Sequence, residues 1–210
     1  MQGLNAADER IAELPHTRSE RLEGLDEAAI LFAAGHGIAA RAVLELLCNR
    51  DPKQGAAWTM LFDVLRALGE REAFEAMLPR FGAHHPKAPM PTWSTPPLSA
   101  NAGMVRLSGV LEEHACLDML VTAARTRRVL AIDLGDVLRI DFGFAPLFCA
   151  ALRQMVVHQS RRVILANVAD LHARALAVSG LPPDVVLLPR RAALGTSAAV
   201  LAEDRVLQAA

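Results

Sequence analysis

A proline-dense segment divides this chain of 210 residues. From Pro86 to Pro97 the sequence reads PKAPMPTWSTPP, with five prolines in twelve positions. Proline lacks a backbone N–H and restricts the residue before it, so this segment can neither continue a helix nor lie inside a sheet. We therefore predict a helical domain over residues 1–86, an extended linker over 87–103 and a second domain over 104–210. Trp93 is expected to dock on one of the two domains.

Two stretches before the linker share the same spacing of glycine and proline. Gly35 and Gly69 stand 34 positions apart, as do Pro52 and Pro86. A helix pair that turns at a small residue and stops before a proline has this pattern. We also predict a helix near residues 6–14. The residues expected to pack the repeats are Gly35, Ala40, Pro52, Trp58, Leu61, Gly69, Leu78 and Pro86.

The 34-residue period, with Trp58 and Leu61 in the first helix of its second unit, resembles the tetratricopeptide repeat family. Gly24 and Phe74 depart from that family's pattern, since they replace a tryptophan and a small residue. The resemblance implies a concave helical face that binds a peptide or a partner domain. The alternative is that these helices only pack on each other and on the second domain.

Strand-like and helix-like segments alternate after the linker. We predict strands over residues 104–111, 129–134, 162–168 and 185–188, and helices over 116–124, 144–158, 170–179 and 196–207. Gly135 is expected to end the second strand. Such alternation predicts right-handed crossovers and a largely parallel sheet, whose carboxyl-edge loops form the natural interaction edge.

This order of segments, together with LSGVL and IDLGDVLRIDFGF, resembles the STAS (anti-sigma-factor antagonist) domain family. The resemblance covers residues 104–190 and implies an α/β domain with a mixed, largely parallel sheet. The expected fold class is thus a two-domain protein, with all-α TPR-like helix pairs before a STAS-like domain. The residues that carry the resemblance are Gly109, Leu111, Asp133, Leu134, Ile140 and Asp141.

The position after Asp141 departs from the family. Phosphorylation-regulated STAS domains have a serine there, whereas this chain has Phe142, so that switch chemistry is excluded. Pro146 is expected to delay or displace the first turn of the next helix. The resemblance implies an apolar partner contact anchored by Phe142, and the alternative is that Phe142 folds inward as core. The expected partner-binding residues are Asp133, Gly135, Asp136, Arg139, Asp141, Phe142, Gly143 and Phe144.

The resemblance implies a non-enzymatic bacterial regulatory adaptor in signalling. Its protein partner would be an anti-sigma kinase-like protein, a transporter ATPase or a signalling complex. The alternative is a small-molecule or nucleotide sensor, because α/β sheets of this kind can bind ligands at the same edge.

Several classes of function are disfavoured by composition and motifs. The formal net charge of -1 gives no global field for nucleic acid, and no phosphate-binding glycine motif occurs. We expect no cofactor, no metal site and no catalytic residues. The arginine pairs beginning at Arg127 and Arg161 should lie at one sheet edge and the pair beginning at Arg190 at the opposite edge, all solvated.

The expected location is the cytoplasm. The first residues are polar and acidic, unlike a secretory signal, and the apolar runs are too short for membrane insertion. Cys48, Cys116 and Cys149 are widely spaced among apolar neighbours, which indicates buried free thiols in a reducing compartment.

Overall fold

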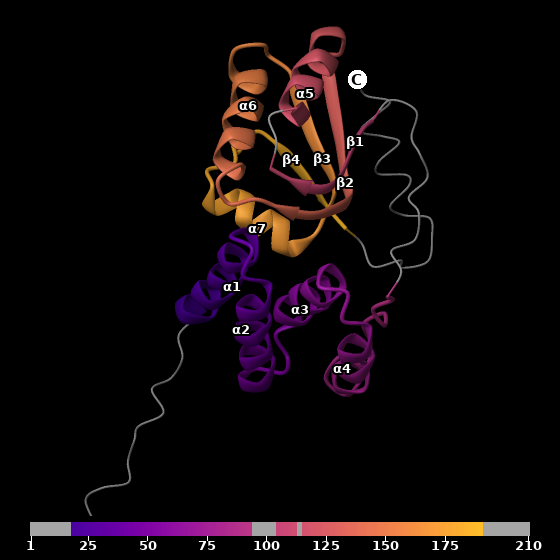
Figure 1. Cartoon of the computed structure of the whole chain (residues 1–210). Coiled ribbons are helices and arrows are strands. Elements are labelled where there is room, and N and C mark those ends of the chain that lie inside the picture. The colour runs from indigo at the N-terminus through magenta and orange to yellow at the C-terminus, as the bar shows by residue number, and fades with distance from the viewer. Residues whose placement is uncertain (1–17, 94–103, 113–114, 191–210) are drawn as a thin grey trace, which may run out of the picture.

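In a computed structural model, the chain forms a helical region followed by a sheet with helices (Figure 1). The structure describes residues 18–93, 104–112 and 115–190, with only the backbone for residues 18–23 and 115. The helices expected near residues 6–14 and over 196–207 therefore lie outside the described residues, as does most of the linker.

Two helix pairs make up the N-terminal region. The bounds of the fourth helix fall 34 positions after those of the second, and the third ends 34 positions after the first. Gly35 and Gly69 occupy the turns within the pairs with φ of +85° and +75°, a left-handed backbone that favours glycine. The predicted period is therefore present in the helix bounds. The four helices are α1 (Arg18–Ala33), α2 (Gly37–Arg50), α3 (Gly55–Ala67) and α4 (Arg71–His84).

Trp58 is the centre of the helical core. Its side chain is fully buried, and its ring lies 6.2 Å from that of Phe62 and 6.0 Å from that of Phe81. Its Nε1–H donates to the carbonyl oxygen of Pro52 at 2.9 Å, so the one polar group of this buried indole has a hydrogen-bond partner. Of the residues expected to pack the repeats, Ala40, Trp58 and Leu61 are buried, Pro52 and Leu78 are half-buried, and Gly35, Gly69 and Pro86 are exposed at turns and helix ends.

The beginning of the predicted linker docks on the helical region, as expected for Trp93. The Trp93 ring meets that of Phe74 edge-on, with 5.3 Å between centroids. Arg66 donates from Nε and Nη2 to the carbonyl oxygen of Thr92, at 3.0 Å and 2.7 Å. The chain is therefore fixed against α3 and α4 as far as residue 93.

A four-stranded sheet with the order β1-β2-β3-β4 forms the C-terminal region. All pairings among the described strands are parallel, which corrects the expectation of a mixed sheet. The strands are β1 (Val105–Leu111), β2 (Val129–Ile140), β3 (Arg162–Val168) and β4 (Val186–Pro189), and the helices are α5 (Ala115–Thr126), α6 (Ala145–Val157) and α7 (Asp170–Val178).

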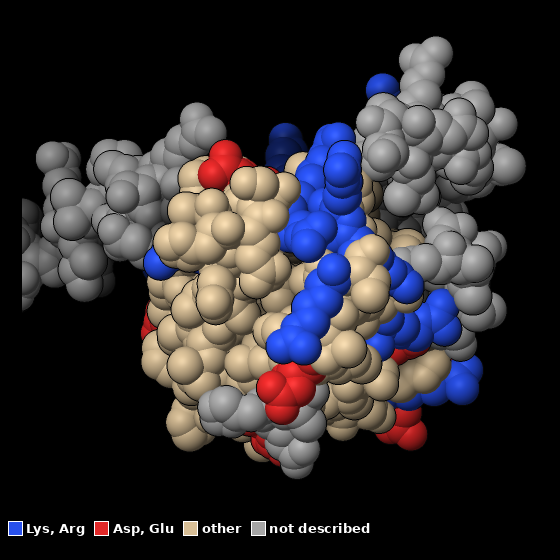
Figure 2. All heavy atoms as spheres, turned by 90° about the horizontal axis from the view of Figure 1, so that it is seen from above, with Lys and Arg blue, Asp and Glu red and all other residues tan. Residues whose placement is uncertain are grey.

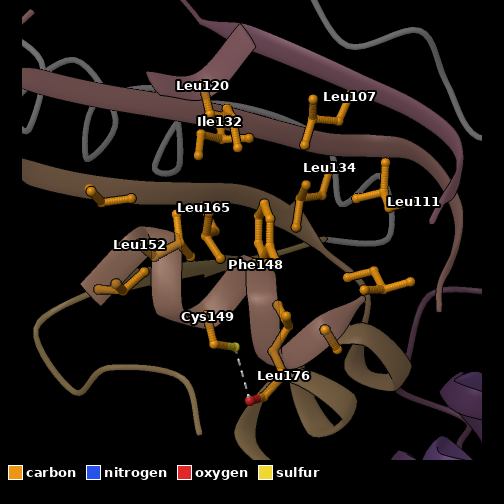
Figure 3. Packing of buried hydrophobic residues seen from close by; sticks show 14 of the residues in the cluster. Leu107, Leu111, Leu120, Ile132, Leu134, Phe148, Cys149, Leu152, Leu165 and Leu176 are labelled. Carbon is orange, nitrogen blue, oxygen red and sulfur yellow. Dashed lines mark hydrogen bonds between the residues drawn. The ribbon is translucent and has the colours of Figure 1, made fainter. Parts of the chain in front are cut away.

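The main core lies between one face of the sheet and these helices (Figure 3). Alternate residues of β2, such as Ile132 and Leu134, point toward Phe148 and Leu152 of α6. The Cys149 thiol lies 3.6 Å from the carbonyl oxygen of Leu176, which ties α6 to α7 (Figure 3). Because the strands follow chain order, crossovers of one hand place their helices on the same face of the sheet.

β2 does not end at Gly135, contrary to the sequence prediction. It continues to Ile140, because its second half pairs with the end of β1, where Ser108 faces Asp136 and Leu111 faces Ile140. Two irregularities of register accompany this pairing, each with an extra residue in β2, and one of them lies opposite Gly109, which has φ of +73°. The segment expected to be a loop after Asp133 is therefore a strand.

The helical region packs against α7. Leu171 is a member of the hydrophobic cluster of α1–α4, although it belongs to the helix that follows β3. Thr59 donates to Asp170 at 2.7 Å, and Arg174 pairs with Asp26 at 2.6 Å. Figure 1 shows α7 beside α1, between the helical region and the sheet. The division into two domains stays a prediction, and these contacts cross it.

Candidate functional site at the carboxyl edge of the sheet

Three of the residues predicted to contact a partner are buried. Phe144 has 3% of its surface exposed and belongs to the core under the sheet, 6.1 Å from Phe148. Asp133 and Gly135 are buried within β2. Burial leaves these three residues little surface for a direct contact with a partner, and Phe144 is part of the core under the sheet.

Asp133 joins the middle of β2 to the end of β3. Its Oδ1 accepts the backbone N–H of Gly135 and the side-chain Nδ2–H of Asn167, each at 2.9 Å. Asn167 has φ of +58°, a conformation that asparagine adopts more readily than most residues. Arg106 lies 3.7 Å from Asp133 and 3.8 Å from Asp136. Asp133 thus connects the middle of β2 to the end of β3, and Arg106 lies close to the carboxylates of both Asp133 and Asp136.

The turn after β2 is attached to α1. Arg139 Nη1 and the backbone N–H of Phe142 both donate to the carbonyl oxygen of Ala33, each at 3.1 Å. Asp141 lies 3.6 Å from Arg139, and its Oδ1 accepts the N–H of Gly143 at 2.9 Å. Two of the residues predicted to bind a partner, Arg139 and Phe142, therefore contact the helical region.

The ring of Phe142 remains available to solvent, with 45% of the residue exposed. Leu138 and Leu147, on either side in sequence, are 54% and 44% exposed. α6 begins at Ala145 with Pro146 in its first turn, so the expected delay of this helix is wrong. Proline is well tolerated there, and the carbonyl oxygen of Asp141 accepts the N–H of Ala145 at 2.8 Å. The structure thus places Phe142 at the surface, on a fixed turn.

A cavity of about 200 Å³ lies between α3 and this edge of the sheet. Its polar lining includes Asp63 and Arg66 of α3, Asp136 of β2, His172 of α7, and Arg190 just after β4. Its walls come from both the helical region and the sheet.

Asp63 holds two arginines in this cavity. Its Oδ1 lies 2.8 Å from Arg66 Nη1 and 3.6 Å from Arg190 Nη1. Burial raises the pKa of the Asp63 carboxyl, against the effect of both arginines, and burial lowers the pKa of Arg66. Arg190 also donates to the carbonyl oxygen of Gly135 at 2.6 Å, so the expectation that Arg190 is solvated is wrong.

His172 is a buried histidine that sequence analysis did not single out. It is 4% exposed, and its Nε2 lies 3.4 Å from the carbonyl oxygen of Leu138. Burial, with a contribution from the charge of Arg190, lowers the pKa of His172 to about 4. This histidine is therefore neutral near pH 7. A single histidine in a short amphipathic helix gives no signal of such a position in the sequence.

The opposite edge of the sheet carries arginines, as predicted. Arg162 pairs with Val129 in the ladder, and its N–H donates to the carbonyl oxygen of Arg128, so the two arginine pairs meet where β2 and β3 begin. Seen from that end of the molecule, basic side chains form a band across the described surface (Figure 2). This band is remote from the cavity.

The three cysteines are free, as expected. Cys48 and Cys149 are buried and Cys116 is half-buried. Burial raises the pKa of Cys48 to about 12 and that of Cys149 to about 11, which makes both thiols unreactive near neutral pH.

Within the described ranges, no three His, Cys, Asp or Glu side chains are grouped so that they could hold a metal ion. None of the helices described is both long and apolar enough to span a membrane. No protein-family model matches this chain, and neither a curated protein nor a solved structure matches it. The resemblances to tetratricopeptide repeats and to STAS domains therefore rest on sequence motifs and spacing.

Proposed function

We propose that this chain is a cytoplasmic, non-enzymatic bacterial regulatory adaptor that binds a partner protein at the turn after β2. The observation that carries the proposal is the exposed ring of Phe142 on a turn held by hydrogen bonds to Ala33 and within Asp141–Gly143. An aromatic side chain on a pre-organised turn is a frequent interface anchor, because it buries much apolar area at a small cost in conformational freedom.

The lack of a serine at this turn supports a contact that phosphorylation does not switch. With Phe142 in place of a serine, phosphate cannot be added there, so partner release must come from another event. The partner classes implied by the STAS resemblance are an anti-sigma kinase-like protein, a transporter ATPase and a signalling complex. The helical repeats would supply a second contact, and nucleic acid is not a proposed ligand.

The test is affinity capture from source cells with wild-type protein, Phe142→Glu and the matched control Val157→Glu. Val157 is 59% exposed at the far end of α6, so it receives the same change at a distance from the turn. We expect Phe142→Glu to lose the partner, with affinity reduced by at least about 30-fold, while Val157→Glu retains it. Circular dichroism and thermal unfolding verify that both variants are folded.

Either of two results would contradict the proposal. A partner that Phe142→Glu still binds would move the contact away from this turn. Equal loss in both variants would indicate a general effect of added charge.

A further inference from the structure

The sheet has a second apolar face, which the described helices leave without an apolar cover. Successive side chains of a strand point to opposite faces. The residues of β2 and β3 that pack against α5, α6 and α7 are Leu130, Ile132, Leu134, Val163 and Leu165. The residues between them, on the second face, include Ala131, Ile164 and Ala166. The hydrophobic cluster of α1–α4 contains no strand residue, so it does not cover this face either.

The side chains at the centre of this second face are nevertheless buried. Ile164 is 2% exposed and Ala131 is 6% exposed. The neighbours of Ile164 in register are Ala131 and the half-buried Val186. These two side chains flank Ile164 but do not lie above it, so its burial requires an apolar layer on this face. Parallel sheets are in general covered on both faces.

The segments outside the described residues differ in what they could supply to such a layer. Residues 1–17 precede α1, which meets the sheet at its last residue, Ala33, and therefore begins about 23 Å away from that contact. Residues 94–103 contain one leucine and no valine or isoleucine. Residues 191–210 contain five large aliphatic side chains, which are Leu194, Val200, Leu201, Val206 and Leu207. The C-terminal segment is therefore the best source of an apolar layer.

The position and length of this segment also fit. The N–H of Arg190 donates to the carbonyl oxygen of Val168 at 2.7 Å, so the segment starts at the carboxyl edge, beside the end of β3. The helix predicted over residues 196–207 would be about 18 Å long, and a strand of the length of β3 spans about 20 Å. One side of that helix has only apolar side chains, those of Ala198, Ala199, Ala202 and Val206.

We propose that the second face of the sheet is the docking surface of this chain's own C-terminal segment. Residues 196–207 form a helix that runs from the carboxyl edge back across β3 and β4 and packs Ala198, Ala202 and Val206 over Ile164. The sheet is then the middle layer of three. This contact goes beyond partner binding at Phe142 and does not depend on it.

The first test is hydrogen exchange of the full wild-type chain, followed by mass spectrometry. We expect the amides of residues 196–207 to exchange at least about tenfold more slowly than in an unstructured chain. This protection should be the same after dilution of the protein, because the contact is within one chain. Exchange at the unstructured rate would overturn the proposal. Protection that is lost on dilution would assign the face to a second copy and would also overturn it.

The second test places a charge in the contact from the side of the sheet. Val186→Glu, on the second face, should raise the exchange rate of residues 196–207 by about tenfold, while β2 and α6 stay protected. Val157→Glu makes the same change on α6 and should leave that rate unaltered. If Val186→Glu instead exposes residues 94–103, those residues cover the face and the proposal is wrong.

The third test places the charge on the segment itself, so it does not depend on whether the strand variant folds. Ala202→Glu, on the apolar side of the predicted helix, should release residues 196–207. Ser197→Glu, on the opposite side of that helix, should not. Protection that Ala202→Glu leaves intact, or that both variants remove equally, would overturn the proposed packing.

Discussion

Arg139, near the end of β2, donates a hydrogen bond from Nη1 to the carbonyl oxygen of Ala33, the last residue of α1, across 106 positions of sequence. The final carbonyl groups of a helix have no partner within it and carry partial negative charge. The sheet therefore caps the end of α1, and this contact links the turn at Gly35 to the turn that carries Phe142.

The two turn glycines test this link, because they differ only in their surroundings. Alanine at either position is strained by about 1–2 kcal/mol, since both have positive φ. A Cβ on Gly35 would lie 3.0 Å from Arg139 Nη1, whereas one on Gly69 would meet nothing within 4 Å. We expect Gly35→Ala to be about 1 kcal/mol less stable than Gly69→Ala in urea unfolding, because Arg139 must shift from Ala33. The difference should vanish in an Arg139→Ala background, and its persistence there would argue against the link.

The place of Leu171 in the helical core predicts that the chain unfolds as one unit. Leu171→Ala and Leu176→Ala change the same helix α7, but Leu171 packs with α1–α4 and Leu176 packs under the sheet. Each should lower the free energy of unfolding by about 2–5 kcal/mol. We expect both to shift a single transition seen by tryptophan fluorescence, which reports the helical region, and by far-ultraviolet circular dichroism. Separate transitions would show that the two regions fold independently.

Asn167 allows backbone strain and side-chain bonding to be separated. Asn167→Gly keeps the positive φ without strain but loses the hydrogen bond to Asp133. Asn167→Ala loses the hydrogen bond and adds the strain. Both should be destabilised by about 1–3 kcal/mol for the lost bond, with alanine about 1 kcal/mol worse than glycine. Chemical denaturation measures both, and a glycine variant no more stable than the alanine variant would exclude strain at this position.

His172 predicts a loss of stability in mild acid. Its pKa falls from 6.5 to about 4 on folding, chiefly through burial. Between these values the unfolded chain takes up a proton that the folded chain does not, so stability decreases as pH falls through this window. From His172 alone, we expect the free energy of unfolding to be about 2 kcal/mol lower at pH 5 than at pH 7. Asp63 has the opposite effect on stability. Burial raises the pKa of its carboxyl, so above its ordinary pKa of 3.8 the unfolded chain loses a proton that the folded chain keeps, and stability decreases as the pH rises.

Urea unfolding at pH 7 and pH 5 measures this contribution. We expect His172→Gln to lose most of the acid sensitivity, whereas His158→Gln, at the exposed end of α6, should retain it. An unchanged pH dependence in His172→Gln would mean that other groups dominate.

Features that depend on local sequence were predictable. The turns at Gly35 and Gly69 follow from glycine chemistry and a fixed period, and the burial of Trp58 follows from its spacing on a helix. The predicted strand over residues 162–168 has the bounds of β3, because its apolar residues 163–166 are buried on a central strand of the sheet.

Features that depend on a distant partner were missed. Gly135 does not end β2, since β1 supplies hydrogen bonds to the residues beyond it. Arg190 could not be assigned to the cavity without knowing that α3 brings Asp63 to the end of β4. Phe144, two residues after the exposed Phe142, is buried because the turn directs it under the sheet, and composition alone does not separate the two.

The membership of Leu171 in the helical core also affects how this protein is made. On a ribosome, α1–α4 emerge well before α7, and N-terminal units generally begin to fold first. Here the helical cluster remains incomplete until β1, β2 and β3 have been synthesised and α7 can deliver Leu171. The nascent helices must therefore keep an apolar surface uncovered during much of translation, which makes this interval the time at which the chain is most exposed to chaperones and to aggregation.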